Sequence, residues 1–438
     1  MSSVLSEEQR RQLHEMLDAV LDGTPVKLDC FEEAERALSE GMHRLGNQAL
    51  QAWADSANTS GAVPKCPCCG EPMRHRGCPS CVVTTTFGDV KCRRPRRRCD
   101  RCQEELYPHD ARLWFAGHAV SWPLAKVTAR LMRWMPAEQV RTILMQDHRV
   151  ELSKQTIQEI AHTAGEILLA QEDAQRKAFF ALSPGEQAKG MPRSPRSAPV
   201  VAVYADGAML HAEGEWREIR VGRVRALDAE KQAVAQKTFA RFLSLEEFGR
   251  QLFLDAYHTG YGQASQRVFL GDGAHWLWEL AALHFPEAVP ILDWYHLSEN
   301  LHQAAHGVFG VGTEEARAWA KERLSELWEG RHRQARVAIG VLKKQVRSPA
   351  KREALRKLEV YLKNNADRMD YPRYRVAGLP IGSGPVESAC KCLVGTRCKQ
   401  AGMRNWRCRR AEAILRLRAA LYDHQFDGLW SSRLHQAA

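Results

Sequence analysis

Long hydrophobic runs are missing from this sequence. About 18 or more apolar residues in a row are needed to cross a bilayer, and no such run occurs, in keeping with a mean hydropathy of -0.43. Residues 1–17 also lack the apolar centre and small-residue cleavage site of a signal peptide. We therefore expect no membrane partner and a cytoplasmic location.

Acidic residues are too few to balance the basic ones. The 438 residues include 63 Lys or Arg against 52 Asp or Glu, which gives a net charge of +11. Such a surplus favours a polyanionic partner, and nucleic acid is the leading candidate. A content of 44% hydrophobic and 26% charged residues excludes a wholly disordered or collagen-like chain. The length predicts roughly three structural units.

Shifts in composition divide the chain into regions. Helical spacing of apolar residues alternates with a Cys-, Arg- and Pro-rich stretch, and a Pro-, Gly- and Ser-rich segment marks the clearest boundary. After that boundary, short β-branched runs alternate with helical patterns, which predicts an α/β region. The expected regions are a helical hairpin (1–60), a cysteine-rich module with a β-hairpin around a Gly-Asp turn (61–112), a helical region (113–182), a linker (183–198), the first part of the α/β region (199–299), a helical segment (300–375), the second part of the α/β region (376–425) and a tail (426–438).

Two CxxC pairs dominate the cysteine-rich module. Cys66 and Cys69 form one pair, and Cys99 and Cys102 form the other. This spacing lets two thiolates share one tetrahedral zinc ion through a tight turn, so two pairs make a four-ligand site. In a reducing compartment, clustered cysteines indicate metal binding rather than disulfides. We predict one structural zinc ion at these four residues.

A third CxxC leaves the zinc assignment open in detail. Cys78 and Cys81 lie between the two pairs, so a second, incomplete site remains an alternative. A thioredoxin-like redox role is the less favoured interpretation, because it requires a βαβ context that the module lacks.

A basic run lies beside the second cysteine pair. Residues 91–102 contain seven basic side chains in twelve, among them Arg96, Arg97 and Arg98. A rigid platform of this kind is suited to contact with phosphates. The alternative is a solvated basic face.

A helix-turn-helix pattern follows in the helical region. Residues 136–150 have a helical pattern, and Ser153 is a good N-cap for a second helix. Lys154, Gln155 and Gln158 near the start of that helix could reach base edges in a major groove. An ordinary helical hairpin is the alternative, and the two interpretations are nearly balanced.

Three carboxylates occupy positions that suit them for catalysis or metal binding. Asp206 and Asp272 each follow an apolar strand, and Glu387 lies in a first helical turn after Pro385. Together they could share a metal ion. Taken singly, each has an ordinary explanation, since Asp-Gly often forms a turn and a glutamate in a first turn often caps a helix.

The order of these motifs resembles that of bacterial insertion-sequence DDE transposases, closest to the ISKra group and related to Mutator-like transposases. The resemblance covers roughly residues 60–425. It is carried by the CxxC pairs, YADGAML (204–210), GDGAHWLWELAALHFPEAVPILDWYHLSENL (271–301) and GLPIGSGPVESACKCLVGTRCKQAGMRNW (378–406). Two features depart from the family pattern, namely the extra Cys78 and Cys81 and the position of Asn405.

The resemblance implies a multidomain α/β protein. Its catalytic core would be ribonuclease-H-like and split by an α-helical insertion, and a zinc-ribbon-like module and helical DNA-binding segments would precede it. Asp206, Asp272 and Glu387 would bind Mg²⁺ or Mn²⁺, whose preferred ligands are hard oxygens. Asp293 and His296 of the DWYH motif would be accessory residues. For His296, a partly buried helix contact is an equally favoured alternative.

The resemblance also implies the partners. The protein would bind double-stranded DNA at element ends and at the target, act as a homo-oligomer and associate with the nucleoid. Residues 391–420 hold nine Lys or Arg against one acid. We predict contact with the DNA backbone near the cleavage position for four of these residues, namely Arg397, Lys399, Arg404 and Arg407. The alternatives are a zinc-containing DNA-binding regulator derived from a transposase, without cleavage, and a nuclease that cuts and never joins.

Two aspartates compete for the second catalytic position, because Asp272 and Asp293 both end an apolar strand. In a ribonuclease-H-like sheet, the strand of Asp206 lies beside the strand of Asp272, and the strand of Asp293 lies one place further out. Neighbouring strands are about 4.8 Å apart. We therefore predict that Asp272 is the metal ligand.

Overall fold

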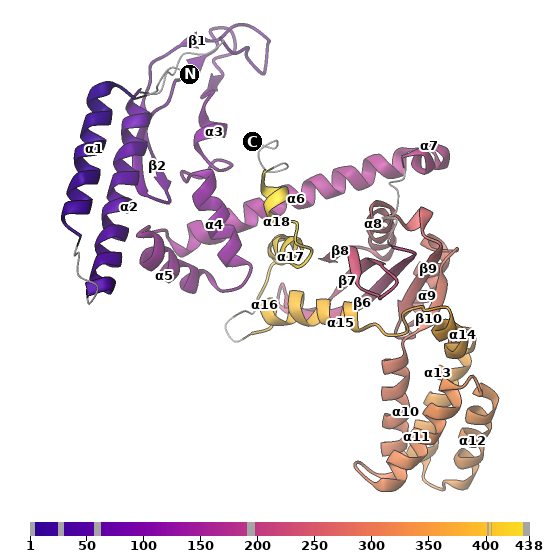
Figure 1. Cartoon of the computed structure of the whole chain (residues 1–438). Coiled ribbons are helices and arrows are strands. Elements are labelled where there is room, and N and C mark those ends of the chain that lie inside the picture. The colour runs from indigo at the N-terminus through magenta and orange to yellow at the C-terminus, as the bar shows by residue number, and fades with distance from the viewer. Residues whose placement is uncertain are drawn as a thin grey trace. The chain divides into compact units, whose positions relative to one another are not determined.

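The computed structural model describes residues 5–24, 30–56, 63–190, 198–400, 403 and 405–431 (Figure 1). The protein is mixed α/β, as the sequence predicts, and contains a five-stranded mixed sheet. It divides into two compact units, one of residues 1–167 with 427–438 and the other of residues 168–426. In the part of the chain that is described, every helix is too short or too polar to cross a membrane.

The first unit begins with two helices, α1 (Glu7–Asp22) and α2 (Phe31–Ser56). The start of α1 is fixed by a capping box in which the Ser6 hydroxyl accepts from the Gln9 backbone, while the Gln9 side chain accepts from the Ser6 backbone. The two helices pack closely at Gly41, where an added Cβ would lie 2.4 Å from Val20. Glycine at this position therefore lets the hairpin close.

The cysteine-rich module contains two small sheets. Their strands are β1 (Arg74–His75), β4 (Arg97–Arg98) and β5 (Glu105–Leu106) in the order β1-β4-β5, and the hairpin of β2 (Ser80–Thr85) with β3 (Gly88–Arg93). The hairpin turns at Thr86–Phe87, so the Gly-Asp turn that the sequence suggested is wrong. Gly88 instead pairs with Thr85 and has a φ of 95°, which glycine adopts without strain.

The rest of the first unit is helical. Its helices are α3 (Asp110–Leu113), α4 (Trp122–Met132), α5 (Ala137–His148) and the first part of α6 (Lys154–Ala181). At the other end of the chain, α18 (Phe426–Leu429) precedes Trp430, which is buried and stacks on Phe115 with ring centroids 5.5 Å apart. The expected tail therefore contributes a large apolar side chain to the core of this unit, as far as the structure describes it.

The second unit is built on the five-stranded sheet. Its strands are β6 (Val200–Ala212), β7 (Glu215–Leu227), β8 (Ala233–Arg241), β9 (Gln266–Gly271) and β10 (Val289–Leu292), in the order β10-β9-β6-β7-β8. β6, β7 and β8 are antiparallel, whereas β9 and β10 run parallel to β6. β6 does not end at Asp206 as expected, because its pairing with β7 continues past Asp206 to Ala212.

Helices cover both faces of this sheet. Along β6, Val201 and Val203 pack in one hydrophobic cluster with α8 (Leu245–His258) and α9 (His275–His284). Ala202 and Tyr204 pack in another cluster with α10 (Trp294–Phe309), α15 (Gly384–Ala389) and α17 (Cys408–Tyr422). Because side chains alternate along a strand, Asp206 belongs to the face of Tyr204.

The remaining elements include the predicted helical segment, which extends away from the sheet beyond β10 (Figure 1). It begins at Trp294 rather than near residue 300. Its helices are α10 (Trp294–Phe309), α11 (Glu314–Trp328), α12 (His332–Gln345), α13 (Pro349–Asn364), η3 (Ala366–Arg368) and α14 (Tyr371–Val376). The chain then forms α15 (Gly384–Ala389), the π-helical η4 (Cys390–Gly395), α16 (Thr396–Cys398) and α17 (Cys408–Tyr422). The expected linker contains α7 (Pro184–Lys189), and η2 (Tyr261–Gln263) precedes β9.

Candidate functional site

The two predicted CxxC pairs fold into two similar turns. In the first, the Gly70 amide donates to the Cys66 carbonyl at 2.9 Å, and in the second the Gln103 amide donates to the Cys99 carbonyl at 3.0 Å. The residue after each pair has a positive φ, 75° at Gly70 and 62° at Gln103. Each turn thus directs two sulfur atoms to the same side of its backbone.

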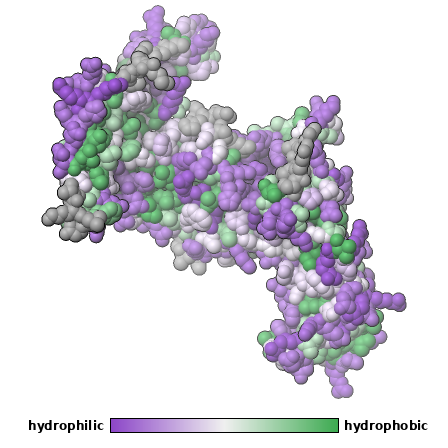
Figure 2. All heavy atoms as spheres, in the orientation of Figure 1, coloured by the Kyte–Doolittle hydropathy of each residue, from purple (hydrophilic) through white to green (hydrophobic). Residues whose placement is uncertain are grey.

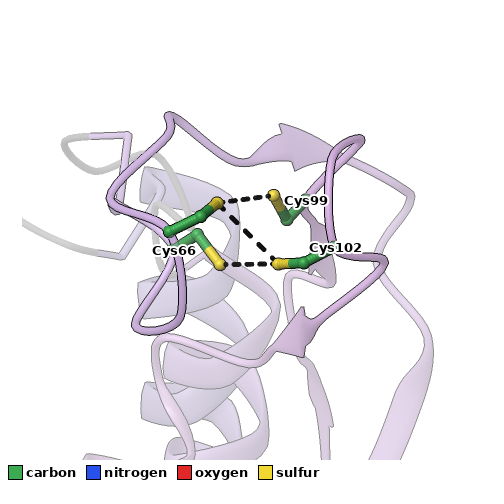
Figure 3. Close-up of side chains that lie close together, drawn as sticks. Cys66, Cys99 and Cys102 are labelled. Carbon is green, nitrogen blue, oxygen red and sulfur yellow. Dashed lines mark hydrogen bonds between the residues drawn. The ribbon is translucent and has the colours of Figure 1, made fainter.

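The four sulfur atoms of these turns come together (Figure 3). All of them lie within 4.8 Å of one another, with Cys66 Sγ 3.3 Å from Cys102 Sγ and Cys69 Sγ 3.5 Å from Cys99 Sγ. Zinc–sulfur bonds of about 2.3 Å in a tetrahedron place sulfur atoms about 3.8 Å apart. The predicted clustering is confirmed, and the site could hold a metal ion such as zinc.

The electrostatics of this cluster favour a thiolate at Cys99. The backbone N–H of Cys102 donates to its sulfur atom and lowers the pKa of Cys99 to about 7. Metal ions bind the deprotonated form of cysteine, so the lowered pKa assists binding at Cys99. Burial and hydrogen bonds to neighbouring thiols raise the pKa values of Cys69 and Cys102, so without a metal ion the cluster favours one thiolate. Cys66 and Cys99 are buried, with Met73 as the other buried member of the small core.

The third CxxC does not join this cluster. Cys78 is exposed, and its sulfur atom lies 3.3 Å from His75 Nε2. Cys81 lies on β2, directly opposite Cys92 on β3. The two residues of the third CxxC thus have separate surroundings, and among the described residues neither shares a group of three or more metal-ligand atoms within 4.8 Å.

The predicted DNA-contact arginines of the module lie on and beside β4. Arg96 forms an ion pair with Glu105 of β5, and Arg97 and Arg98 are half-buried on the central strand of the small sheet. Arg98 also lies opposite Glu105 in the strand register. Arg94 of the same run pairs with Asp110 at 3.3 Å, so two acidic residues partly neutralise the basic run.

The helix-turn-helix candidate forms α5, a five-residue connection and α6. The Ser153 hydroxyl accepts from the Thr156 amide at 3.0 Å, which is the predicted N-cap. Lys154, Gln155 and Gln158 are all exposed. Lys154 forms an ion pair with Glu138 of α5 at 2.8 Å, a contact that ties the two helices together.

The predicted carboxylates come from separate elements of the second unit. Asp206 lies in β6, two residues beyond Tyr204 in the last pair that β6 forms with β9, and Asp272 follows the end of β9. Asp293 follows β10 and caps α10, where its Oδ1 accepts from the Tyr295 amide at 2.7 Å. Glu387 lies in α15. The expected strand neighbourhood of Asp206, Asp272 and Asp293 is present in the sheet order.

The tightest group consists of Asp293, His296 and Glu387. Their ligand-type atoms lie within 4.8 Å of one another. His296 Nδ1 is 2.9 Å from Asp293 Oδ2 and 3.8 Å from Glu387 Oε1. The Ser383 hydroxyl donates to Asp293 and also lies 2.8 Å from Glu387 Oε1. One hydroxyl and one imidazole therefore join the end of β10 to α15.

Negative charge accumulates around His296. Its hydrogen bond to Asp293 raises the pKa of His296 to about 9, with further contributions from the charges of Asp293, Asp272 and Glu387. Burial raises the pKa of Asp206, and the charge of Asp272 raises it further. The pKa of Asp293 is lowered, because the bonds from His296, Ser383 and the Tyr295 amide outweigh its burial.

The predicted triad is not a tight cluster by itself. Among the described residues, only two groups of three or more ligand atoms lie within 4.8 Å, and neither contains Asp206 or Asp272. Asp206 Oδ2 accepts from Cys390 Sγ at 3.4 Å, and Asp272 Oδ1 accepts from the Ala274 amide at 2.8 Å. Asp206 and Asp272 therefore interact with the group of Asp293, His296 and Glu387 through their charges and not through direct contact.

The predicted DNA-contact residues of the basic segment after Glu387 differ in their exposure to solvent. Arg397 is buried, with its guanidinium over the Trp406 ring and bonded to Met403 Sδ at 3.3 Å, so its side chain is turned away from the surface. Lys399 and Arg407 are exposed, as DNA contact requires. Arg404 lies outside the described residues.

Two side chains of the site were missed from the sequence. Ser383 links Asp293 to Glu387, and Cys390 contacts Asp206. The SGPVES string offered a signal for Ser383, since a serine four residues before a glutamate at a helix start can reach it. No local pattern predicted the contact of Cys390, because Asp206 is 184 residues away.

Comparison of the sequence with protein-family models and with curated proteins gave no match.

Proposed function

We propose that this protein is a DDE-type DNA transposase. It would bind insertion-sequence ends as a homo-oligomer, cleave them with Mg²⁺ or Mn²⁺ and join the freed 3′ hydroxyl to target DNA. The proposal takes the central sheet as a ribonuclease-H-like core interrupted by a helical insertion. It is the function that best accounts for several acidic side chains gathered at one sheet edge in a basic protein.

The observation that carries the proposal is the convergence of carboxylates on His296. Asp206, Asp272 and Asp293 come from three adjacent parallel strands, and Glu387 comes from a helix on the face of Asp206. Parallel strands present their carboxyl ends at one edge of a sheet, where sites of α/β proteins form. The charges of Asp272, Asp293 and Glu387 raise the pKa of His296, and the charge of His296 also acts on Asp206.

The donor set fits a hard divalent cation. The carboxylates supply oxygen ligands, which Mg²⁺ prefers. Burial is the main cause of the raised pKa of Asp206, and repulsion by the like charge of Asp272 adds to it. A bound metal pair would supply activation of the attacking oxygen and stabilisation of the leaving oxygen. Asp206, Asp272 and Glu387 are the residues that would hold it.

Asp293 and His296 have a positioning role in this proposal. Asp293 is fully buried and accepts hydrogen bonds from His296, Ser383 and the Tyr295 amide. It therefore fixes the ring of His296 and the start of α10. His296 and Ser383 in turn hold Glu387 near the ends of the strands.

A cleavage assay tests the proposal. Full-length protein is incubated with labelled duplex carrying the sequences that flank its gene, with Mg²⁺ or with a chelator. We expect cuts at element ends and joined products with Mg²⁺ alone. Binding without cleavage would identify a DNA-binding regulator instead, and cleavage without joining would identify a nuclease.

The cysteine-rich module is expected to contribute phosphate contacts. Changing Arg96, Arg97 and Arg98 to alanine should weaken duplex binding and flatten its dependence on salt. Each lost phosphate contact reduces the log-log slope by about 0.9, so three lost contacts reduce it by about 2.7. Fluorescence anisotropy with labelled duplex at several salt concentrations measures the slope.

A matched triple variant controls for the change in net charge. Arg10, Arg11 and Arg36 are exposed on α1 and α2, and their replacement by alanine removes the same charge from another surface. We expect this control to keep the slope of the unmodified protein. Equal slopes for both triple variants would identify the run at residues 91–102 as a solvated basic face.

A further inference from the structure

One helical hairpin of this protein carries a large net positive charge. Residues 332–364, which form α12, α13 and the turn between them, contain ten Lys or Arg against two Glu, a net charge of +8. The whole chain has a net charge of +11. The other two long helices of the insertion, α10 and α11, each carry a net charge of -1. The charge therefore belongs to the hairpin and not to the insertion in general.

Most of these cations face solvent without an acidic partner. Lys343 pairs with Glu359, and Arg356 pairs with Glu353 at 2.7 Å. Within the described residues, the other eight cations form no ion pair, and all eight are exposed. They are Arg333, Arg336, Lys344, Arg347, Lys351, Arg352, Lys357 and Lys363. Unpaired like charges at this density repel one another unless an anion is bound.

A groove at the end of the hairpin gathers several of them. It is widely open to solvent, with a volume of about 580 Å³, and lies between the last turn of α12 and the start of α13. Its lining residues are Lys343, Lys344, Pro349, Arg352, Glu353 and Arg356. The first turn of α13 contains no acidic residue, and hydrophilic spheres alternate with hydrophobic ones over the outer part of the insertion (Figure 2).

We propose that the α12–α13 hairpin binds the phosphate backbone of double-stranded DNA. The inference rests on the proposed function and adds to it a contact surface distinct from the cysteine-rich module and the carboxylate site. Lysine binds a phosphate as a compact charge, and arginine can bind two phosphate oxygens at once. Contacts of this kind carry no sequence information, so the hairpin would hold DNA of any sequence.

The length of the charged surface favours a polymer over a small anion. Helices of 14 and 16 residues are about 21 and 24 Å long. Duplex DNA carries one negative charge per about 1.7 Å of its axis, so a surface of this length faces many phosphates. A single phosphate or nucleotide would occupy the groove alone and leave the cations of α12, such as Arg333 and Arg336, without a partner.

The test is a salt titration of duplex binding by the full-length protein. In the test variant, Lys344→Gln and Arg352→Gln remove two groove cations. In the control, Arg317→Gln and Lys321→Gln remove two exposed cations from α11. We expect the test variant to bind a random-sequence duplex more weakly and to lose about 1.8 from the log-log slope, at about 0.9 per contact. The control should keep the original slope. Thermal unfolding of both variants checks that they fold.

The outcomes separate this inference from the proposed function. If the unmodified protein binds duplex DNA and the two variants have equal slopes, the hairpin inference is overturned while the transposase proposal stands. If the unmodified protein does not bind duplex DNA, both are overturned. The inference also fails if the test variant loses self-association, or binding to duplex RNA, while its binding to DNA is unchanged. The exposed Val337 and Val341 on α12 make self-association a necessary measurement.

Discussion

Replacing Asp272 by asparagine is expected to abolish Mg²⁺-dependent strand cleavage while DNA binding survives. Asn has the shape of Asp but lacks the charge that a divalent cation requires. We expect a loss of about 1,000-fold or more in the cleavage rate, equal to about 4 kcal/mol of activation free energy. Asp272 is half-buried and its Oδ1 bond to the Ala274 amide is local, so the fold should tolerate the change. Single-turnover cleavage and anisotropy measure the two properties separately.

Asp293→Asn is the matched comparison for this experiment. Asp293 is fully buried and bonded to His296, Ser383 and the Tyr295 amide, so its replacement should destabilise the protein by about 1.5–3 kcal/mol. We expect a lower unfolding temperature and measurable cleavage below that temperature. Abolished cleavage in Asp293→Asn with retained cleavage in Asp272→Asn would reverse the assignment of the second catalytic acid.

Removing two of the predicted zinc ligands should strongly affect the metal content and the folding of the cysteine-rich module. Replacing Cys99 and Cys102 by serine is expected to eliminate about one equivalent of bound zinc and to unfold the module around residues 63–112. Structural zinc contributes about 10–16 kcal/mol in small zinc-finger peptides. The buried core at this site consists of Cys66, Met73 and Cys99, which is too small to replace that contribution. Metal analysis and limited proteolysis measure both losses.

The third CxxC provides the control for the zinc experiment. Replacing Cys78 and Cys81 by serine changes as many cysteines as the Cys99 and Cys102 variant does. These two residues, however, lie outside the four-sulfur cluster. Zinc content and protease resistance should therefore remain at the level of the unmodified protein. Zinc loss in this control with full retention in the Cys99 and Cys102 variant would mean that the ligands were wrongly assigned.

Features that depend on neighbouring residues were readable from the sequence. The CxxC spacing predicted the four-sulfur cluster because each turn involves only a few consecutive residues. Ser153 was predicted to cap α6 because an N-cap acts within three residues. Apolar runs before Asp272 and Asp293 likewise indicated β9 and β10, because a buried strand is continuously hydrophobic.

Features that depend on distant residues were not readable. β6 passes Asp206 because β7 pairs with it on the far side, which no local pattern around Asp-Gly reveals. Arg397 was assigned to DNA, yet Trp406 and Met403 cover it. Trp430 was assigned to a tail, yet Phe115 stacks on it from more than 300 residues away.

The sequence by itself determined the α/β class, the clustering of four cysteines and the excess of positive charge, since each follows from composition or from short-range spacing. Only the tertiary structure decided which acidic residues share a site. It placed Asp293 with His296 and Glu387, and left Asp206 and Asp272 beside them, through a sheet order and a helix position set by long-range packing. It also placed Lys343 and Lys344 at the end of α12 around one groove with Arg352 and Arg356 of α13, because two helices must pack before their charges can act together.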